Sequence, residues 1–80
     1  MNTYQIQYFG LLAERRGLAE ETVSLDAATP ATVLGVLTSA HPLGVVRSAL
    51  LAAVNDEFVP WDHPLHDGDR ISLLPPMSGG

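Results

Sequence analysis

Residues 66–80 read HDGDRISLLPPMSGG, a turn signal followed by a strand and an ending in two glycines. The strand is expected over residues 70–74, because Pro75-Pro76 follows it and proline has no N–H to donate to a sheet. The last residues show no apolar period, and chain ends of this kind are commonly poorly ordered. The sequence therefore predicts one folded domain over residues 1–74 and a flexible tail over residues 75–80.

Further strands are expected upstream of this segment. Apolar and polar residues alternate from Tyr4 to Phe9 and from Glu21 to Leu25, which is typical of half-buried strands. Leu50 to Val54 is a short apolar run that fits a buried strand. A return strand should start at Phe58-Val59, after the turn-prone Asn55-Asp56-Glu57.

One main helix is predicted in the middle of the chain. Thr29-Pro30 is a good helix start, and apolar residues then recur at helical spacing until His41-Pro42. A shorter helix is expected over residues 11–16, with Gly17 as its stop. One main helix packed on one sheet is the simplest two-layer arrangement, so the predicted class is α+β.

Composition excludes several functions. The formal net charge is -5, and the four basic residues form no run, so neither nucleic acid nor an anionic membrane is an expected partner. The acidic surface either suits a partner with a basic docking face or only maintains solubility. No signal peptide and no membrane-spanning apolar stretch is visible, so the expected location is cytoplasmic.

The side chains show no pattern typical of an active site. His63 and His66 flank Pro64 in a loop-rich stretch, and there is no cysteine, so no metal site is expected. Asp67 and Asp69 stand at a turn, where carboxylates usually accept hydrogen bonds from nearby backbone N–H groups.

The remaining candidate is the tail itself. Gly79 and Gly80 have no Cβ, so this pair could enter a channel too narrow for other residues. Pro75-Pro76 stiffens the exit, which limits the entropy lost when the tail is threaded into a partner. A carboxylate presented in this way could be adenylated and then accept sulfur as a thiocarboxylate. The alternative is a frayed tail with no role.

Two absences agree with a sulfur-carrying terminus. Without cysteine the chain cannot hold sulfur as a persulfide, so sulfur would have to sit on the terminal carbonyl. Without lysine an activated terminus has no side-chain amine to acylate within its own chain. A composition bias toward arginine would also explain the second absence.

Most of the chain resembles the small subunit of molybdopterin synthase, the MoaD-like family. The Pro-Pro-x-x-Gly-Gly ending is more specific to this family than the Asp-Gly-Asp turn, which several sulfur carriers share. The segments that carry the resemblance are Tyr8-Phe9-Gly10-Leu-Leu-Ala-Glu-Arg-Arg-Gly17, Leu51-Ala-Ala-Val-Asn55, Phe58-Val59, Asp62-His-Pro-Leu65, Asp67-Gly-Asp69 and Leu74-Pro-Pro-Met-Ser-Gly-Gly80.

The resemblance implies a β-grasp, ubiquitin-like fold and a mixed sheet. It implies that an E1-like activating enzyme uses ATP to adenylate Gly80, next to Gly79, and that a sulfur donor system converts it to a thiocarboxylate. The large subunit of the synthase would then bind the tail and hold the catalytic residues, so this chain would be non-catalytic alone and would bind no cofactor. The implied partner-binding residues are Phe9, Phe58, Leu74, Pro75, Pro76, Met77 and Ser78.

Other functions stay open on the sequence. The aromatic and leucine residues at the implied interface could equally be core residues. The same carrier chemistry could serve a thiamine-type pathway. A ubiquitin-like protein modifier, joined to target lysines through Gly80, and a non-catalytic binding module are further alternatives.

Overall fold

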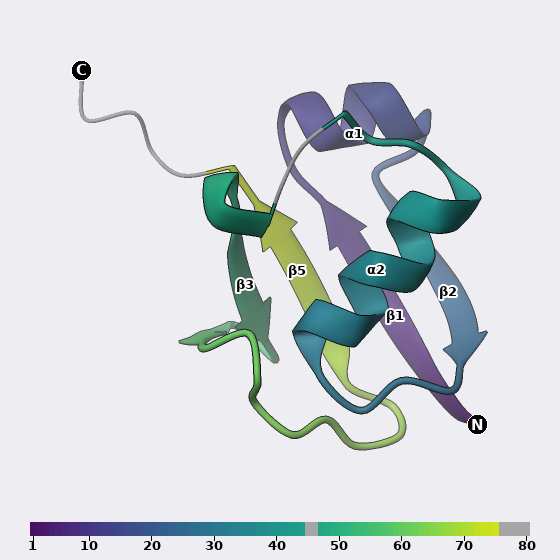
Figure 1. Cartoon of the computed structure of the whole chain (residues 1–80), viewed down its shortest axis with the longest axis vertical. Coiled ribbons are helices and arrows are strands. Elements are labelled where there is room, and N and C mark those ends of the chain that lie inside the picture. Colours follow the sequence, from purple (N-terminus) through teal and green to yellow (C-terminus); the bar gives the residue numbers. More distant parts are fainter. Residues whose placement is uncertain (45–46, 76–80) are drawn as a thin grey trace.

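The computed structural model describes residues 1–44 and 47–75, and the predictions made for Pro76, Met77, Ser78, Gly79 and Gly80 lie outside this range. The order of the elements follows the sequence-based expectation closely (Figure 1). The elements are β1 (Asn2–Tyr8), α1 (Leu11–Arg16), β2 (Glu20–Leu25), α2 (Pro30–Ala40), the 3₁₀ helix η1 (Arg47–Ala49), β3 (Leu51–Val54), β4 (Glu57–Val59) and β5 (Arg70–Leu74).

The strands form one mixed sheet in the order β2-β1-β5-β3-β4. β1 and β5 pair in parallel, from Gln5 opposite Arg70 to Tyr8 opposite Leu73, while the other neighbours are antiparallel. The last strand in the sequence therefore lies in the middle of the sheet. A five-stranded mixed sheet with one main helix is the β-grasp arrangement, so the predicted α+β class and fold are confirmed.

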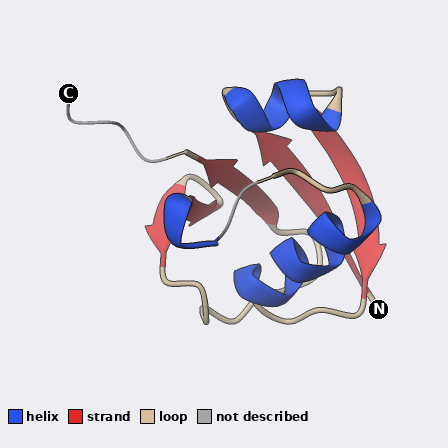
Figure 2. Ribbon diagram, turned by 45° about the horizontal axis from the view of Figure 1, so that its top comes forward, coloured by secondary structure: helices blue, strands red, loops and turns tan. Residues whose placement is uncertain are grey.

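Helix α2 lies across one face of the sheet, in front of β1 and β5 in both views (Figure 1, Figure 2). Its start is the one expected: the Thr29 hydroxyl accepts from Thr32 N, and the Thr32 hydroxyl accepts from Thr29 N. The helix packs its apolar side on alternate strand residues. The largest fully buried side chains are Tyr4, Ile6, Leu12, Val33, Leu43, Ile71 and Leu73, together with Pro30.

Several strand boundaries differ from the prediction by one or two residues: β1 starts at Asn2, β2 at Glu20 and β3 at Leu51. Two further differences are explained by the turns next to the strands. β1 ends at Tyr8, and Phe9 lies outside it, because Gly10 at φ 59° turns the chain into α1. Glu57, expected in a turn, is the first residue of β4. The turn needs only Asn55 and Asp56, whose φ values of 50° and 71° are those of a two-residue hairpin turn.

A charged cluster fastens α1 to β2. Arg16 donates two hydrogen bonds of 2.8 Å to the Glu21 carboxylate, and the Tyr8 hydroxyl donates a third, of 2.6 Å. The hydrogen bonds from Arg16 lower the pKa of Glu21, against the opposing effect of its burial. Burial and the Glu21 carboxylate raise the pKa of Tyr8, so this hydroxyl keeps its proton as a donor.

Within residues 1–44 and 47–75, no helix is long and apolar enough to cross a membrane.

The charged cluster makes a prediction about acid stability. Glu21→Gln should lower the melting temperature at neutral pH by about 4–8 °C, which corresponds to about 1 kcal/mol in a domain of this size. Folding lowers the Glu21 pKa below its ordinary value of 4.5, so its contribution is complete above that pH and is lost on further acidification. Thermal unfolding of both proteins from pH 7 to pH 3 should show the difference shrinking below pH 4.5.

The matched control is Glu20→Gln, which removes an exposed carboxylate from the same strand. It should change the melting temperature by less than the Glu21 variant at every pH. A difference between wild type and Glu21→Gln that grows on acidification would contradict the assigned role.

Candidate functional site

The face of the sheet opposite α2 carries a row of side chains that the strand register places together. Gln7 of β1 is paired with Ser72 of β5, Ser72 with Ala53 of β3, and Ala53 with Phe58 of β4. Residues paired across neighbouring strands point to the same side of a sheet. This row therefore crosses four strands from a polar end at Gln7 to an aromatic end at Phe58.

A shallow hollow lies over this row. Its apolar part, which we call the sheet-face patch, consists of Phe9, Ala53, Phe58 and Leu74, and Gln7, Asp56 and Ser72 complete its lining. The hollow holds about 180 Å³, whereas sites for small molecules usually hold roughly 300–1,000 Å³. It is therefore of a size for a side chain of another protein and not for a whole substrate.

The structure brings Phe9, Phe58 and Leu74 together around one hollow. Phe58 is 71% exposed and Phe9 43% exposed, while Leu74 is half-buried. The alternative that these three residues are core residues is thus wrong for the two phenylalanines. Large apolar side chains gathered on a surface commonly mark a contact site for another molecule.

The chain leaves the sheet beside this patch. Leu74 is the last residue of β5, opposite the half-exposed Leu51, and Pro75 follows it directly. Pro75 lies over Gly10, where an added Cβ would come within 3.4 Å of the Pro75 ring. A partner that covers the patch would therefore also meet the start of the tail.

Four of the residues around the hollow, Gln7, Ala53, Asp56 and Ser72, were not predicted from the sequence as site residues. Gln7 and Ser72 are joined by a hydrogen bond of 3.1 Å from the serine hydroxyl to the glutamine Oε1. Asp56 stands on the rim and forms an ion pair with Arg70 of β5. The alternation of polar and apolar residues in β1 indicates that Gln7 lies on the open face of the sheet. The positions of Ser72 and Asp56 beside it depend on which strands become neighbours, and the sequence alone does not give that order.

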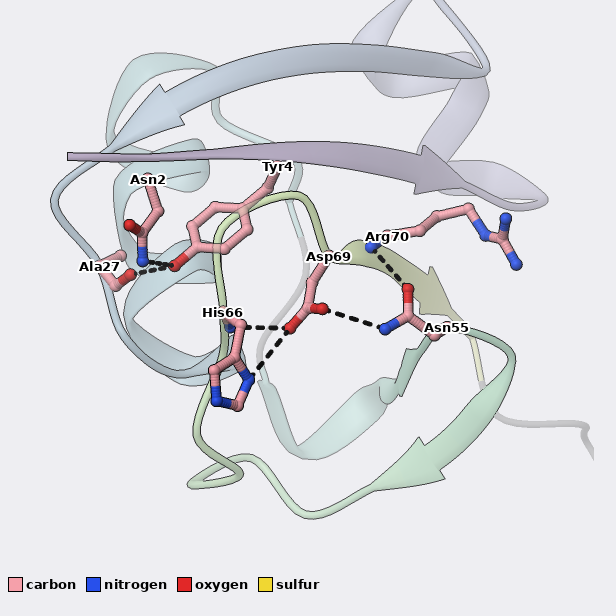
Figure 3. Close-up of polar contacts among 7 residues, drawn as sticks. All are labelled: Asn2, Tyr4, Ala27, Asn55, His66, Asp69 and Arg70. Carbon is pink, nitrogen blue, oxygen red and sulfur yellow. Dashed lines mark hydrogen bonds and ion pairs between the residues drawn. The ribbon is translucent and has the colours of Figure 1, made fainter.

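The carboxylates that drew attention in the sequence have structural partners. Asp67 accepts a hydrogen bond of 2.6 Å from Thr3 N of β1. Asp69 accepts one of 2.8 Å from His66 N, which Figure 3 shows. The expectation that these turn carboxylates bind backbone N–H groups is confirmed. In the part of the chain that the structure describes, no group of three histidine or acidic residues could hold a metal ion.

Comparisons with known proteins find relatives along nearly the whole chain. A family model described as the ThiS family matches residues 6–80. The molybdopterin synthase sulfur carrier subunit of Chlamydomonas reinhardtii is 38% identical over 80 residues, which cover 95% of this chain and 96% of that protein.

Two solved structures extend the comparison to the fold. SAMP1 from Haloferax volcanii, the small archaeal modifier protein 1, matches with a TM-score of 0.81 at 28% identity, covering 99% of this chain and 100% of that one. A complex of subunits 1 and 2 of the molybdopterin-converting factor from Helicobacter pylori contains a chain that matches with a TM-score of 0.70 at 28% identity. This match covers 98% of the present chain and 99% of that one.

The exposure of Phe58 makes a prediction about stability. Phe58→Ser should change the free energy of unfolding by no more than about 0.5 kcal/mol, because the ring is largely solvated in the isolated chain. Leu73→Ala, at a fully buried position of β5, should cost about 2–5 kcal/mol. Denaturant unfolding of both variants measures the two values. A loss of several kcal/mol in Phe58→Ser would show that Phe58 belongs to the core.

Proposed function

The chain belongs to the ThiS family, and on that premise we propose that it is the sulfur carrier subunit of a molybdopterin synthase. The observation that carries the proposal is the sheet-face patch at the point where the chain runs on toward Gly79-Gly80. The relatives named molybdopterin synthase sulfur carrier subunit span nearly the whole chain, which supports this assignment.

The working group in this proposal is the carboxylate of Gly80. On an activating enzyme, a carboxylate oxygen attacks the α-phosphorus of ATP, pyrophosphate leaves and an acyl adenylate forms. Hydrosulfide from a donor system then attacks the acyl carbon. The bond from that carbon to the phosphate oxygen breaks, AMP leaves with the oxygen, and a thiocarboxylate remains. ATP is bound by the activating enzyme, and the proposal assigns no cofactor to this chain.

Sulfur transfer takes place on the large subunit. The thiocarboxylate sulfur attacks a carbon of the pterin precursor, and the bond from that carbon to an oxygen leaving group breaks as the carbon–sulfur bond forms. Water then cleaves the bond between sulfur and the acyl carbon. This step returns the Gly80 carboxylate and leaves the sulfur on the pterin. Because a dithiolene contains two sulfur atoms, each molybdopterin consumes the sulfur of two loaded chains.

The composition of the chain suits this role. The sequence contains no cysteine that would compete for sulfur and no lysine whose amine would attack its own activated terminus. The proposal assigns the catalytic groups for adenylation and transfer to the partners, as the resemblance to the small subunit of the synthase implies.

The proposed docking mode combines the patch with the tail. Phe9, Phe58 and Leu74 give the large subunit an apolar surface to cover, and residues 75–80 enter its active site. The Helicobacter pylori complex, in which a similar chain is paired with subunit 2, supports a large-subunit partner. In this mode the apolar contacts of the sheet-face patch supply the binding affinity, so the last two residues need no side chain for binding.

A second candidate is a protein modifier. The likeness to the small archaeal modifier protein 1 favours it. In that case a lysine amine of a target protein, not hydrosulfide, attacks the acyl adenylate of Gly80 and releases AMP. Covalent conjugates of this chain in extracts of the source cell would identify this reaction.

The carrier function predicts a defined change in mass. After incubation with the activating enzyme, ATP and a sulfur donor, the intact chain should gain the mass difference between one sulfur and one oxygen atom. Deletion of Gly80 should abolish this gain and leave the melting temperature unchanged, because the modified group lies beyond the folded domain. An unchanged mass of the wild-type chain with a competent activating enzyme would contradict the proposal.

The absence of a side chain at Gly79 predicts a further effect. Gly79→Ala should slow the loading of Gly80 by about 10²-fold, because the added Cβ displaces the carboxylate in a narrow channel. Gly35→Ala is the matched control, since it makes the same change on the exposed side of α2, where an added Cβ meets nothing within 4 Å, and it should load at close to the wild-type rate. Single-turnover loading followed by mass spectrometry compares the two variants. Equal rates for Gly79→Ala and wild type would mean that no narrow channel accepts the tail.

A further inference from the structure

We propose that Asn55 is a positioning residue for partner binding, because it fixes the hairpin that holds Phe58 over the sheet-face patch. This inference rests on the proposed function, in which a partner covers the patch. Asn55 does not line the hollow, so its effect on binding passes through the position of Phe58.

The position of Phe58 needs an explanation because the ring is not held by its own burial. Phe58 lies on β4, a strand of three residues at the edge of the sheet. The ring is 71% exposed, so few contacts with the core restrain it. Its distance from Phe9 and Leu74 therefore depends on how the hairpin of β3 and β4 is oriented relative to β5.

Asn55 joins this hairpin to β5 through three hydrogen bonds to two consecutive residues. Its backbone N donates to Arg70 O at 2.8 Å, and its side-chain Oδ1 accepts from Arg70 N at 3.0 Å. Its Nδ2 donates to the Asp69 carboxylate at 3.0 Å (Figure 3). The carboxamide is thus used as an acceptor and as a donor at once.

Asp69 carries the connection onward. Its second carboxylate oxygen accepts from His66 N, and its backbone O accepts from Gln5 N of β1. The Asp69 carboxylate thereby ties the hairpin to the turn before β5, and the Asp69 backbone O ties that turn to β1. Together with the pairing of β3 with β5, these contacts orient the hairpin so that Phe58 lies in the row that begins at Gln7.

The backbone of Asn55 restricts which residue can stand there. Its φ of 50° is one that asparagine, aspartate and glycine adopt at low cost. Of these, only asparagine also offers a donor to Asp69 together with an acceptor for Arg70 N. Asparagine therefore satisfies both the backbone geometry and the hydrogen bonds at position 55.

The test compares binding of purified large subunit to four forms of the intact chain by calorimetry. Asn55→Asp keeps the turn geometry and sets two carboxylates against each other, so affinity should fall about tenfold. The exchange Asn55→Asp with Asp69→Asn restores a donor facing an acceptor and should return affinity to within about twofold of wild type. Ser39→Asp adds a negative charge on the exposed side of α2, which covers the opposite face of the sheet, and should bind like wild type.

A double-mutant cycle with Phe58→Ala identifies the route of the effect. If Asn55 acts through Phe58, Asn55→Asp should lose its effect on affinity in the Phe58→Ala background. Asn55→Gly, which keeps the backbone geometry and removes both side-chain hydrogen bonds, gives the same comparison if the aspartate variant does not fold. A merely structural role of Asn55 would weaken binding equally in both backgrounds. A loss of affinity that disappears in the Phe58→Ala background therefore cannot come from reduced stability alone.

The results separate this inference from the proposed function. Wild-type chain that fails to bind the large subunit, or Phe58→Ala that binds as tightly as wild type, overturns the docking mode and the inference with it. Binding that depends on Phe58 but is unchanged in both Asn55 variants overturns the inference alone. An equal loss in the wild-type and Phe58→Ala backgrounds also overturns it.

Discussion

The parallel pairing of β1 with β5 is the constraint on which the other features depend. It inserts the end of the folded domain between the first strand and β3, so the first and last strands become the centre of the sheet. Ile6 and Ile71 are both fully buried opposite one another and form the middle of the core. Because β1 and β5 run in the same direction, Phe9 and Leu74 emerge at the same end of the sheet.

One face of the sheet packs against α2 and stabilises the fold, and the opposite face carries the candidate docking surface. On β5, Ile71 and Leu73 point to α2 and are fully buried, while Ser72 and Leu74 line the open hollow. The alternation of a single strand thus builds the core and the candidate docking surface at once. A shift of register by one residue would move Leu74 into the core and expose Leu73, so the core also fixes the composition of the patch.

Much of the fold could be predicted because its signals are local. Thr29-Pro30 and His41-Pro42 bound α2 through backbone chemistry that operates within a few residues. The sequence predicts Glu57 in the turn, because a polar residue next to Asn55-Asp56 gives no strand signal of its own. Its place in β4 depends on the pairing of β4 with β3. Phe9 and Phe58 were assigned to an interface through a resemblance, and the sequence by itself could not separate exposed from buried aromatics. The role of Asn55 was also hidden, since its partners Asp69 and Arg70 are close to it only in the folded molecule.

The central place of β5 has a consequence for how the protein is made. A ribosome releases residues 70–74 after the four other strands, so the sheet cannot close until β5 has been made. A product truncated before this strand would lack the middle of its core and would be removed by proteases as an unfolded chain. Folding therefore requires β5, and only chains that contain this strand can present Phe9 and Leu74 at one end of the sheet.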